Sequence, residues 1–341
     1  MEAAVAVVNA HGGVFGKPMH LTVLNDAGDP TQAATVAENL VSSGTKPMAV
    51  SPGTVSTEAE AIAPILEKAG VFMSTHASDP ALDDPAKYPY LFGNGQLPAD
   101  EAISLADTFS KAGYKKVAVL TEDDASGINF FNADKSAFEA KGITATAAYV
   151  PDGATDATSE LEQLLAGKPD ALLLSAYGAT AGPIIKARAE LDPKIPTYGS
   201  QLLTANNLAQ LAPASSYTGI KFQGLAVGVK GTPITKGLAF TAMFAAIKKV
   251  VGGSLTFTMN TYACAYNDVM LAATVANLAK STDAAKMAAA AENLTVKQIP
   301  YLVSPVTFTK TEHFVRFGVD DWVYVPYGPT VDGLLVPGGS S

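Results

Sequence analysis

Cysteine and charge are both scarce in this chain of 341 residues. The single cysteine, Cys264, excludes an internal disulfide and any zinc cluster built from several cysteines. Charged residues make up 16% of the chain, below the ~25% typical of soluble domains, and the formal net charge is −9. Because a negative surface repels a phosphate backbone, the composition argues against nucleic acid as a partner.

Long hydrophobic runs and the common enzyme signatures are absent as well. Gly, Pro, Asn, Lys or Asp interrupts every apolar stretch before it reaches the ~18 to 20 residues of a membrane span. The sequence has no GxSxG elbow, no GxxxxGK[ST] loop and no HExxH, and its four histidines lack metal-ligand spacing. Residues 1–10 lack the basic region and cleavage site of a secretory signal and predict an amphipathic helix. We therefore expect no catalytic residues, no metal and no cofactor.

The residues that are present suit a folded protein of about two domains, with 48% hydrophobic residues. Strand and helix patterns alternate through the first half of the chain, and Asp29 followed by Pro30 is a strong helix start. The first set of predicted elements is a helix at Met1–Asn9, a strand at His20–Asn25, a helix at 30–40, a strand at Met48–Ser51, a helix at Glu58–Lys68 and a strand at Val71–Thr75.

A second set follows a helix that ends at Ala112. It comprises strands at Lys116–Thr121, Ile143–Val150, Asp170–Tyr177 and Thr197–Gly199, with helices between them. Such alternation implies α/β architecture with parallel sheets covered by helices on both faces, and two sets in series predict two doubly wound lobes. The remaining predicted elements are long helices at Ile234–Val251 and Thr261–Leu278, a β-rich tail at Val303–Val325 and a flexible tail at 338–341.

Small hydroxyl residues recur where predicted strands end and helices begin. One loop holds Ser51, Thr54, Ser56 and Thr57, and the next holds Ser74, Thr75 and Ser78. A helix N-terminus offers free N–H donors and a positive dipole end, so these loops suit a carboxylate ligand. An ordinary N-cap is the alternative for each serine alone, and the recurrence favours a binding site. The acidic residues Glu122 to Asp124 are interpreted as a solvated loop that caps the following helix.

Several segments, in order along nearly the whole chain, resemble type I periplasmic binding proteins of the leucine/isoleucine/valine transport family. They are NAHGGVFGKPMHLTVLNDAGDPTQAATVAENLV, SPGTVSTEAEAIAPILEKAG, ASDPAL, TEDDASG, GATDAT and TYACAYNDVMLA. The resemblance implies two α/β lobes joined by three crossovers near Gly95, Leu225 and Arg316. The lobes would be 1–95 with 226–315, and 96–225 with 316–337, followed by the tail 338–341. The family's first strand, central in its sheet, would precede Met1, and either it is missing here or another segment fills its place.

The resemblance also assigns ligand contacts in both lobes. It implies that Ser56 holds a ligand carboxylate beside Thr57, that Ser78 does the same from the next loop, and that His76 and Ala77 line the pocket. From the second lobe, Ser126 would stand where an aromatic residue is frequent, and Tyr177 would wall the pocket. Gln201 would stand where amino-acid binders often carry an acid.

The function so implied is that of a periplasmic or extracytoplasmic receptor for an ABC importer. It would close over a small carboxylate-bearing ligand, by family default a branched-chain or other hydrophobic amino acid, and deliver it to a membrane ABC permease. An aromatic or aliphatic monocarboxylate is the alternative ligand, favoured by the neutral Gln201. A cytoplasmic ligand-sensing regulator and an enzyme are the alternatives from other classes.

Overall fold

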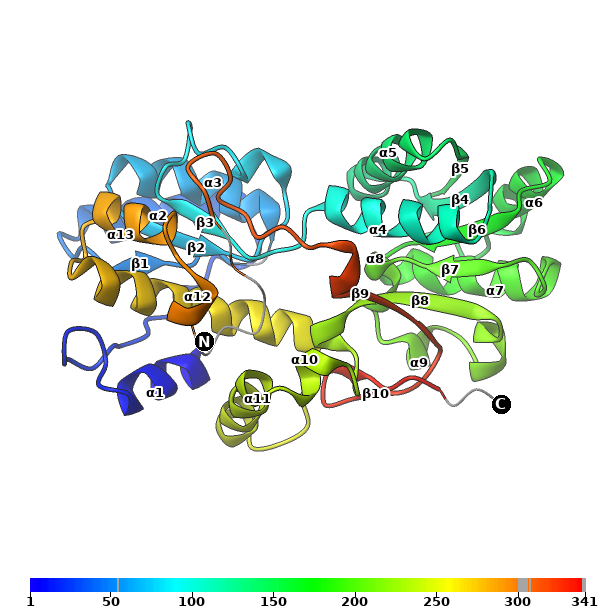
Figure 1. Ribbon diagram of the computed structural model, residues 1–341. Helices are drawn as coiled ribbons and strands as arrows, with labels where there is room; N and C mark the ends of the chain where they lie inside the picture. Colours follow the sequence, from blue (N-terminus) through cyan, green and yellow to red (C-terminus); the bar gives the residue numbers. More distant parts are fainter. Residues whose placement is uncertain (54, 152, 300–305, 307, 339–341) are drawn as a thin grey trace. The chain divides into compact units, whose positions relative to one another are not determined.

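The computed structural model describes residues 1–53, 55–151, 153–299, 306 and 308–338. The chain divides into two compact units (Figure 1). Unit 1 consists of residues 1–97 and 233–316, and unit 2 of residues 98–232 and 317–341. Each unit has a sheet of mostly parallel strands with helices packed against it, which is the α/β class that the alternating pattern predicts.

Unit 1 is built on a short parallel sheet in which strand β2 lies between β1 and β3. The strands are β1 (Ala49–Val50), β2 (Phe72–Thr75) and β3 (Leu91–Gly93). The helices are α1 (Glu2–Ala10), α2 (Pro30–Ser42), α3 (Ser56–Lys68), α10 (Pro233–Lys236), α11 (Leu238–Val251), α12 (Met259–Ala279) and α13 (Ala284–Ala291). Helix α2 begins as its sequence predicts, because the Asp29 carboxylate accepts the Gln32 N–H at 2.8 Å and Pro30 occupies the first turn.

The strand predicted at His20–Asn25 is wrong, because these residues belong to none of the strands in the described part of the chain. A β-strand forms only when its N–H and C=O groups pair with those of a neighbouring strand. The register of β1 runs to β2 alone, with Ala49 opposite Phe72 and Val50 opposite Met73. The apolar alternation of residues 20–25 therefore has no adjacent strand to pair with.

Two further predictions need correction in the second half of the chain. The helix predicted at Ile234–Val251 is two helices, α10 and α11, because Gly237 adopts an extended conformation between them and is the N-cap of α11. Within the tail predicted to be β-rich, residues 303–305 and 307 lie outside the described residues, and strand β9 begins only at Trp322. Residues 339–341 of the predicted flexible tail also lie outside them.

Unit 2 has a six-stranded sheet in the order β5-β4-β6-β7-β8-β9. All its neighbours pair in parallel except β9, which runs antiparallel to β8. Its strands are β4 (Lys116–Glu122), β5 (Thr144–Val150), β6 (Ala171–Ser175), β7 (Thr197–Gly199), β8 (Ile220–Leu225) and β9 (Trp322–Pro326), with the hairpin β10 (Thr330–Val331) and β11 (Leu334–Leu335). Its helices are α4 (Pro98–Lys111), α5 (Ala125–Ala140), α6 (Thr158–Ala166), α7 (Ala181–Leu191), α8 (Gln201–Thr204) and α9 (Leu208–Leu211).

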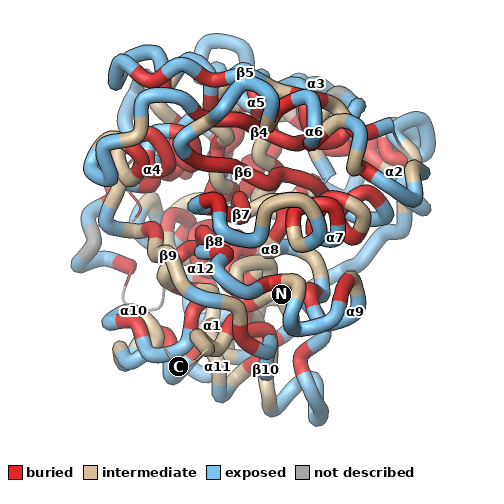
Figure 2. The backbone as a smooth tube through the Cα atoms, turned by 90° about the vertical axis from the view of Figure 1, so that its right-hand side faces the viewer, coloured by how far each residue is buried: buried red, intermediate tan, exposed pale blue. Residues whose placement is uncertain are grey.

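The sheet of unit 2 is buried on both faces. Along β4, Ala118 and Leu120 belong to one hydrophobic cluster, whereas Val117 and Val119 belong to another. Because successive side chains of a strand point to opposite faces, the two clusters are the two layers between sheet and helices. Strand β6 is buried along its whole length and is drawn red in Figure 2. Among the described residues, no helix is long and apolar enough to cross a membrane.

Two buried carboxyl groups lie where α4 packs against α5. Glu101 of α4 and Asp134 of α5 are each 3% exposed. Burial raises the pKa of Glu101 from 4.5 to about 8, and the hydrogen bond from the Gln201 N–H, 2.8 Å from Oε1, offsets part of this effect. Burial and the neighbouring Glu101 also raise the pKa of Asp134 well above its ordinary value. Unit 2 therefore folds around acids that favour their neutral forms.

We predict that Glu101→Gln reduces the loss of stability as the pH rises from 5 to 8. The folded-state pKa of Glu101 lies above its unfolded value, so its contribution is complete below about pH 4.5 and is lost as the pH approaches about 8. A pKa shift of one unit corresponds to about 1.4 kcal/mol of stability. Even part of the pKa shift of Glu101 should therefore change the free energy of unfolding measurably between pH 5 and pH 8 in urea unfolding experiments. Glu139→Gln, which changes a carboxyl 61% exposed on α5, is the control. An identical decline in wild type and both variants would contradict the prediction.

Candidate functional site

The predicted ligand residues of unit 1 lie at one edge of its sheet. Strands β1 and β2 are parallel, so the loops after them leave the same edge. The Thr75 hydroxyl joins these loops, because it donates to the Gly53 carbonyl and accepts the Ala77 N–H, both at 3.1 Å. The structure therefore brings Ser56 and Thr57, at the start of α3, to the same edge as residues 76–78.

Helix α3 begins without the side-chain cap that helices α2, α5, α12 and α13 have. Its N-cap is Val55, whereas Asp29 and Asp124 cap α2 and α5. The first hydrogen bond of the helix runs from the Ala59 N–H to the Val55 carbonyl at 3.1 Å, which leaves the three preceding N–H groups without an acceptor in the helix. These donors and the partly buried Ser56 form an arrangement that suits an anion.

Ser56 and Thr57 differ in what their hydroxyl groups contact. The Thr57 hydroxyl donates to Oε2 of the buried Glu58 at 2.9 Å. The Ser56 hydroxyl has no hydrogen-bond partner among the residues that the structure describes. Of the two, Ser56 has the hydroxyl that can turn to a ligand.

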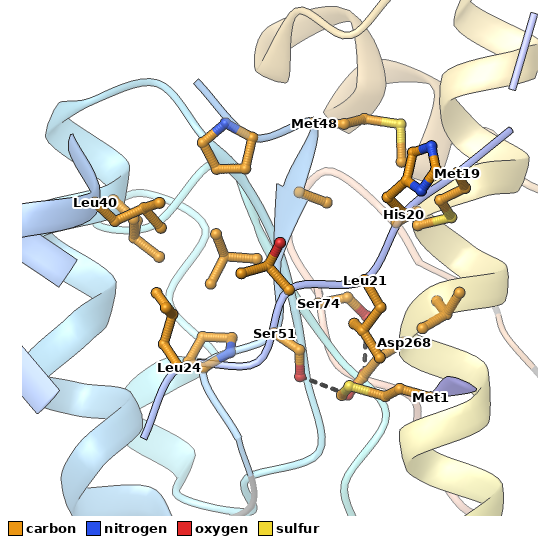
Figure 3. A pocket seen from close by; sticks show the side chains of 18 of the residues that line it. Met1, Met19, His20, Leu21, Leu24, Leu40, Met48, Ser51, Ser74 and Asp268 are labelled. Atoms are coloured by element: carbon orange, nitrogen blue, oxygen red, sulfur yellow. Dashed lines mark hydrogen bonds between the residues drawn. The ribbon is translucent and has the colours of Figure 1, made fainter. Parts of the chain in front are cut away.

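A buried carboxylate, Asp268 of α12, holds the ends of all three strands of unit 1. Its Oδ1 accepts hydrogen bonds from Ser74 Oγ at 2.9 Å and from Asn94 Nδ2 at 2.5 Å. Its Oδ2 accepts from Ser51 Oγ at 2.9 Å and from His76 Nδ1 at 2.8 Å. The serine bonds are drawn as dashed lines in Figure 3. The side chain of Asp268 is 1% exposed, so these four donors replace water around it.

Asp268 and its four donors, Ser51, Ser74, His76 and Asn94, are called the Asp268 cluster. This cluster explains where His76 lies. The sequence predicts that His76 lines a ligand pocket or donates a hydrogen bond, and in the structure Nδ1 donates to Asp268 while the side chain is 7% exposed. Its role toward a ligand stays a prediction, as do those of Ala77, which is buried, and Ser78, which is half-buried in the same loop. Sequence reasoning missed Asp268 itself, although an acid inside an Ala-rich helix is a signal for a buried contact.

In unit 2, the three predicted residues follow three neighbouring strands. Ser126 comes after β4, Tyr177 after β6 and Gln201 after β7, and these strands are adjacent in the sheet. Strand β4 lies between β5 and β6, so the strand order changes direction at β4. Ligands of open α/β sheets bind at the carboxyl ends of strands where this change occurs. The structure therefore brings these three residues to the edge of the sheet that favours a ligand.

At this edge of unit 2, acidic side chains accept hydrogen bonds from backbone N–H groups near the predicted residues. The Tyr177 N–H donates to Oε2 of Glu122 at 2.8 Å, and the Tyr177 side chain is 57% exposed. Ser126 lies in the first turn of α5, where Asp124 accepts the Gly127 N–H at 2.7 Å. Asp124 is thus a helix cap as expected, but Glu122 is 6% exposed, so its assignment to a solvated loop is wrong.

Neither a metal site nor a reactive thiol is found in the described part of the chain. No group of three or more His, Cys, Asp or Glu side chains there is arranged to hold a metal ion. The Cys264 thiol is buried with Sγ 3.4 Å from the Asn94 carbonyl, and burial raises its pKa far above the ordinary value. It therefore behaves as a packed apolar group.

We predict that Asp268→Asn lowers the free energy of unfolding by about 2–4 kcal/mol. The amide nitrogen of asparagine donates, so two of the four donors at residue 268 lose their acceptor, and a hydrogen bond to a charged group contributes about 1.5–3 kcal/mol. Glu38→Gln, which changes an exposed acid on α2, is the matched control and should shift the urea midpoint little. A loss below about 1 kcal/mol for Asp268→Asn would show that the cluster does not hold the sheet together.

The sequence and fold are similar to those of known solute-binding proteins. The Leu/Ile/Val-binding protein BraC3 of Rhizobium johnstonii is 24% identical over 313 residues, covering 91% of this chain and 81% of that protein. The Leu/Ile/Val-binding protein of Escherichia coli K12 is 25% identical over 335 residues, covering 94% and 84%.

Solved structures share the fold at lower sequence identity. A type 1 periplasmic binding protein from Bordetella pertussis matches with a TM-score of 0.79 at 18% identity, covering 100% of this chain and 91% of that one. A substrate-binding protein from Desulfitobacterium hafniense in complex with Leu matches with a TM-score of 0.67 at 19% identity, covering 86% and 82%. A Rhodopseudomonas palustris solute-binding protein in complex with 4-hydroxybenzoate matches with a TM-score of 0.74 at 21% identity, covering 98% and 89%.

The type I periplasmic binding protein architecture predicted from the sequence is thereby confirmed. A family model described as periplasmic binding protein matches residues 1–318. The chain belongs to the periplasmic binding protein family.

Proposed function

We propose that this protein is the solute receptor of an ABC importer and that its ligand is a small hydrophobic amino acid. It acts in the periplasm or outside the cytoplasm, passes the ligand unchanged to a membrane permease and catalyses no reaction. Two findings support the ligand class: the curated relatives are named Leu/Ile/Val-binding proteins, and a neighbouring structure is a complex with Leu.

The observation that carries the proposal is the start of helix α3. A carboxylate placed there meets backbone N–H groups that have no acceptor within the helix, together with the Ser56 hydroxyl. Charge-assisted hydrogen bonds of this kind are short and strong. Ser78, from the loop after β2, supplies a second hydroxyl at the same edge of the sheet. We infer that unit 1 binds the carboxylate of the ligand.

The residues of unit 2 are proposed to contact the rest of the ligand. Tyr177 offers an exposed aromatic ring at the end of β6, which suits an apolar side chain. Gln201 begins α8, and Ser126 lies near the start of α5. Because an amide carries no charge, Gln201 can accept a hydrogen bond from an ammonium group but cannot balance its charge.

We predict that Ser56→Ala weakens ligand binding far more than Thr57→Ala. Loss of a hydrogen bond to a charged group amounts to about 1.5–3 kcal/mol, or roughly 10- to 150-fold in Kd. Thr57 is the matched control, because its hydroxyl already donates to Glu58. Isothermal titration calorimetry with leucine measures both variants, and equal small effects would contradict the role of Ser56.

We predict that the α-amino group of the ligand adds little affinity in the wild type and more in Gln201→Glu. Calorimetry should compare leucine with its 2-keto analogue in both proteins, with 4-hydroxybenzoate as a third ligand. Because Glu supplies the charge that Gln lacks, the preference for leucine should rise by roughly tenfold or more in the variant. If the wild type already binds leucine at least tenfold more tightly than the 2-keto analogue, another acid balances the ammonium group. Binding of 4-hydroxybenzoate alone would overturn the amino-acid assignment, and chemical conversion of a ligand would overturn the receptor assignment.

A further inference from the structure

Glu101 lies directly behind Gln201, the residue proposed to accept a hydrogen bond from the ammonium group of the ligand. Its Oε1 accepts the backbone N–H of Gln201 at 2.8 Å, which joins helix α4 to the start of helix α8. The neighbouring Ser200 fixes the same point to the sheet, because its hydroxyl caps α8 and donates to Ser175 Oγ at 3.0 Å. A ligand group that contacts Gln201 is therefore separated from the Glu101 carboxyl group by little more than residue 201 itself.

The hydrogen bond to Gln201 does not by itself require an acid at position 101. A glutamine there would accept the same N–H through its side-chain oxygen and would carry no charge into the interior. Glu101 is 3% exposed, and among the described residues neither it nor the neighbouring Asp134 forms an ion pair with a basic side chain. Because a buried charge without a counter-charge destabilises a fold, an acid kept beside a binding edge is evidence that its charge has a role.

The groups that face Glu101 favour its ionisation over their own. Asp134 belongs to α5, which packs against α4 (Figure 1), and burial together with Glu101 raises its pKa well above the ordinary value. Tyr324 of β9 stays neutral as well, because burial raises the pKa of its hydroxyl, which accepts a hydrogen bond from Gln223 Nε2 at 3.1 Å. Glu101 alone of these three groups accepts a backbone N–H, which stabilises its ionised form. Glu101 is therefore the first of them to ionise as the pH rises.

We propose that Glu101 is a specificity-determining residue of the receptor, which in its ionised form supplies the negative charge that Gln201 lacks. With Glu101 neutral, this edge of unit 2 distinguishes poorly between an amino acid and an acid without an amino group. With Glu101 ionised, the same edge attracts the ammonium group of the ligand, because charges close together inside a protein are screened little. The inference rests on the proposed function and gives the receptor a preference for amino acids that grows with pH.

The direction of this pH dependence follows from the pKa of Glu101. Burial raises the pKa to about 8, so the carboxyl group is largely neutral at pH 6 and increasingly ionised above pH 8. A nearby ammonium group favours the ionised form and lowers the pKa in the complex. Leucine binding therefore releases part of a proton near neutral pH and becomes tighter as the pH rises. The 2-keto analogue of leucine, which has no ammonium group, should show neither effect.

Calorimetry of the wild type tests this at about pH 6 and about pH 8.5 with leucine and its 2-keto analogue. The two ligands share the carboxylate, so the ratio of their Kd values cancels any effect of pH on the carboxylate site. We expect the preference for leucine to rise at least about threefold over this range. Titrations near pH 7 in phosphate and in Tris, which differ in ionisation enthalpy, should show release of about 0.2–0.5 proton per leucine and none with the analogue.

Three variants identify the acid that titrates. Glu101→Gln keeps an acceptor for the Gln201 N–H, so it should bind both ligands with a preference that no longer changes with pH and without proton release. Asp134→Asn retains Glu101 and should keep the rise. Glu139→Gln removes an exposed acid of α5 and is the matched control, which should behave as the wild type. Proton release in the wild type tests the inference independently of how well any variant folds.

A preference for leucine that is constant with pH in the wild type would overturn the role of Glu101 and leave the receptor function intact. So would a rise that persists in Glu101→Gln, or one that is lost only in Asp134→Asn. Equal proton release by the two ligands would also overturn it, because the titrating group would then respond to the carboxylate. Failure of leucine to bind at either pH would overturn the proposed function together with this inference.

Discussion

Unit 1 depends on a single carboxylate, because Asp268 accepts hydrogen bonds from the ends of three successive strands. The sheet itself is short, with two residues in β1 and three in β3, so its ladder alone supplies few hydrogen bonds. The four donors of the Asp268 cluster fasten the strand ends to helix α12. The loops that carry Ser56 and Ser78 leave from these fastened ends, so the geometry of the candidate site follows from the buried acid.

In unit 2, the strand ends are held by a larger sheet and by acidic side chains that accept hydrogen bonds from backbone N–H groups. Glu122 accepts the N–H of Tyr177, and Glu101 accepts the N–H of Gln201. Glu122 thus holds the backbone just after β6, and Glu101 holds the backbone at the start of α8. The rigid part of the edge is the backbone, and the exposed ring of Tyr177 is free to adapt to what it contacts.

The sequence predicts those elements whose boundaries are local. Asp29 and Pro30 start α2, and β7 lies at Thr197–Gly199 as expected, because caps and apolar runs are visible in a few consecutive residues. The strand at His20–Asn25 was wrong because a strand depends on a partner that the local pattern cannot supply. Asp268 was missed for a similar reason, since its four donors are distant in sequence. The crossovers are predicted near Gly95, Leu225 and Arg316, and the boundaries between the two units fall after Leu97, Thr232 and Arg316. The ligand contacts stay predictions.

The wide separation of Asp268 from its donors has a consequence for biosynthesis. The carboxylate follows Ser51 by 217 residues and Asn94 by 174 residues along the chain. During translation, the strands of residues 49–93 leave the ribosome long before the acid that fastens them, whereas five of the six strands of unit 2 lie in one continuous stretch. Because contacts of high sequence separation form late, unit 2 can become ordered while the first 97 residues still expose apolar surface. The nascent chain is thus prone to aggregate through residues 1–97 for as long as α12 has not been synthesised.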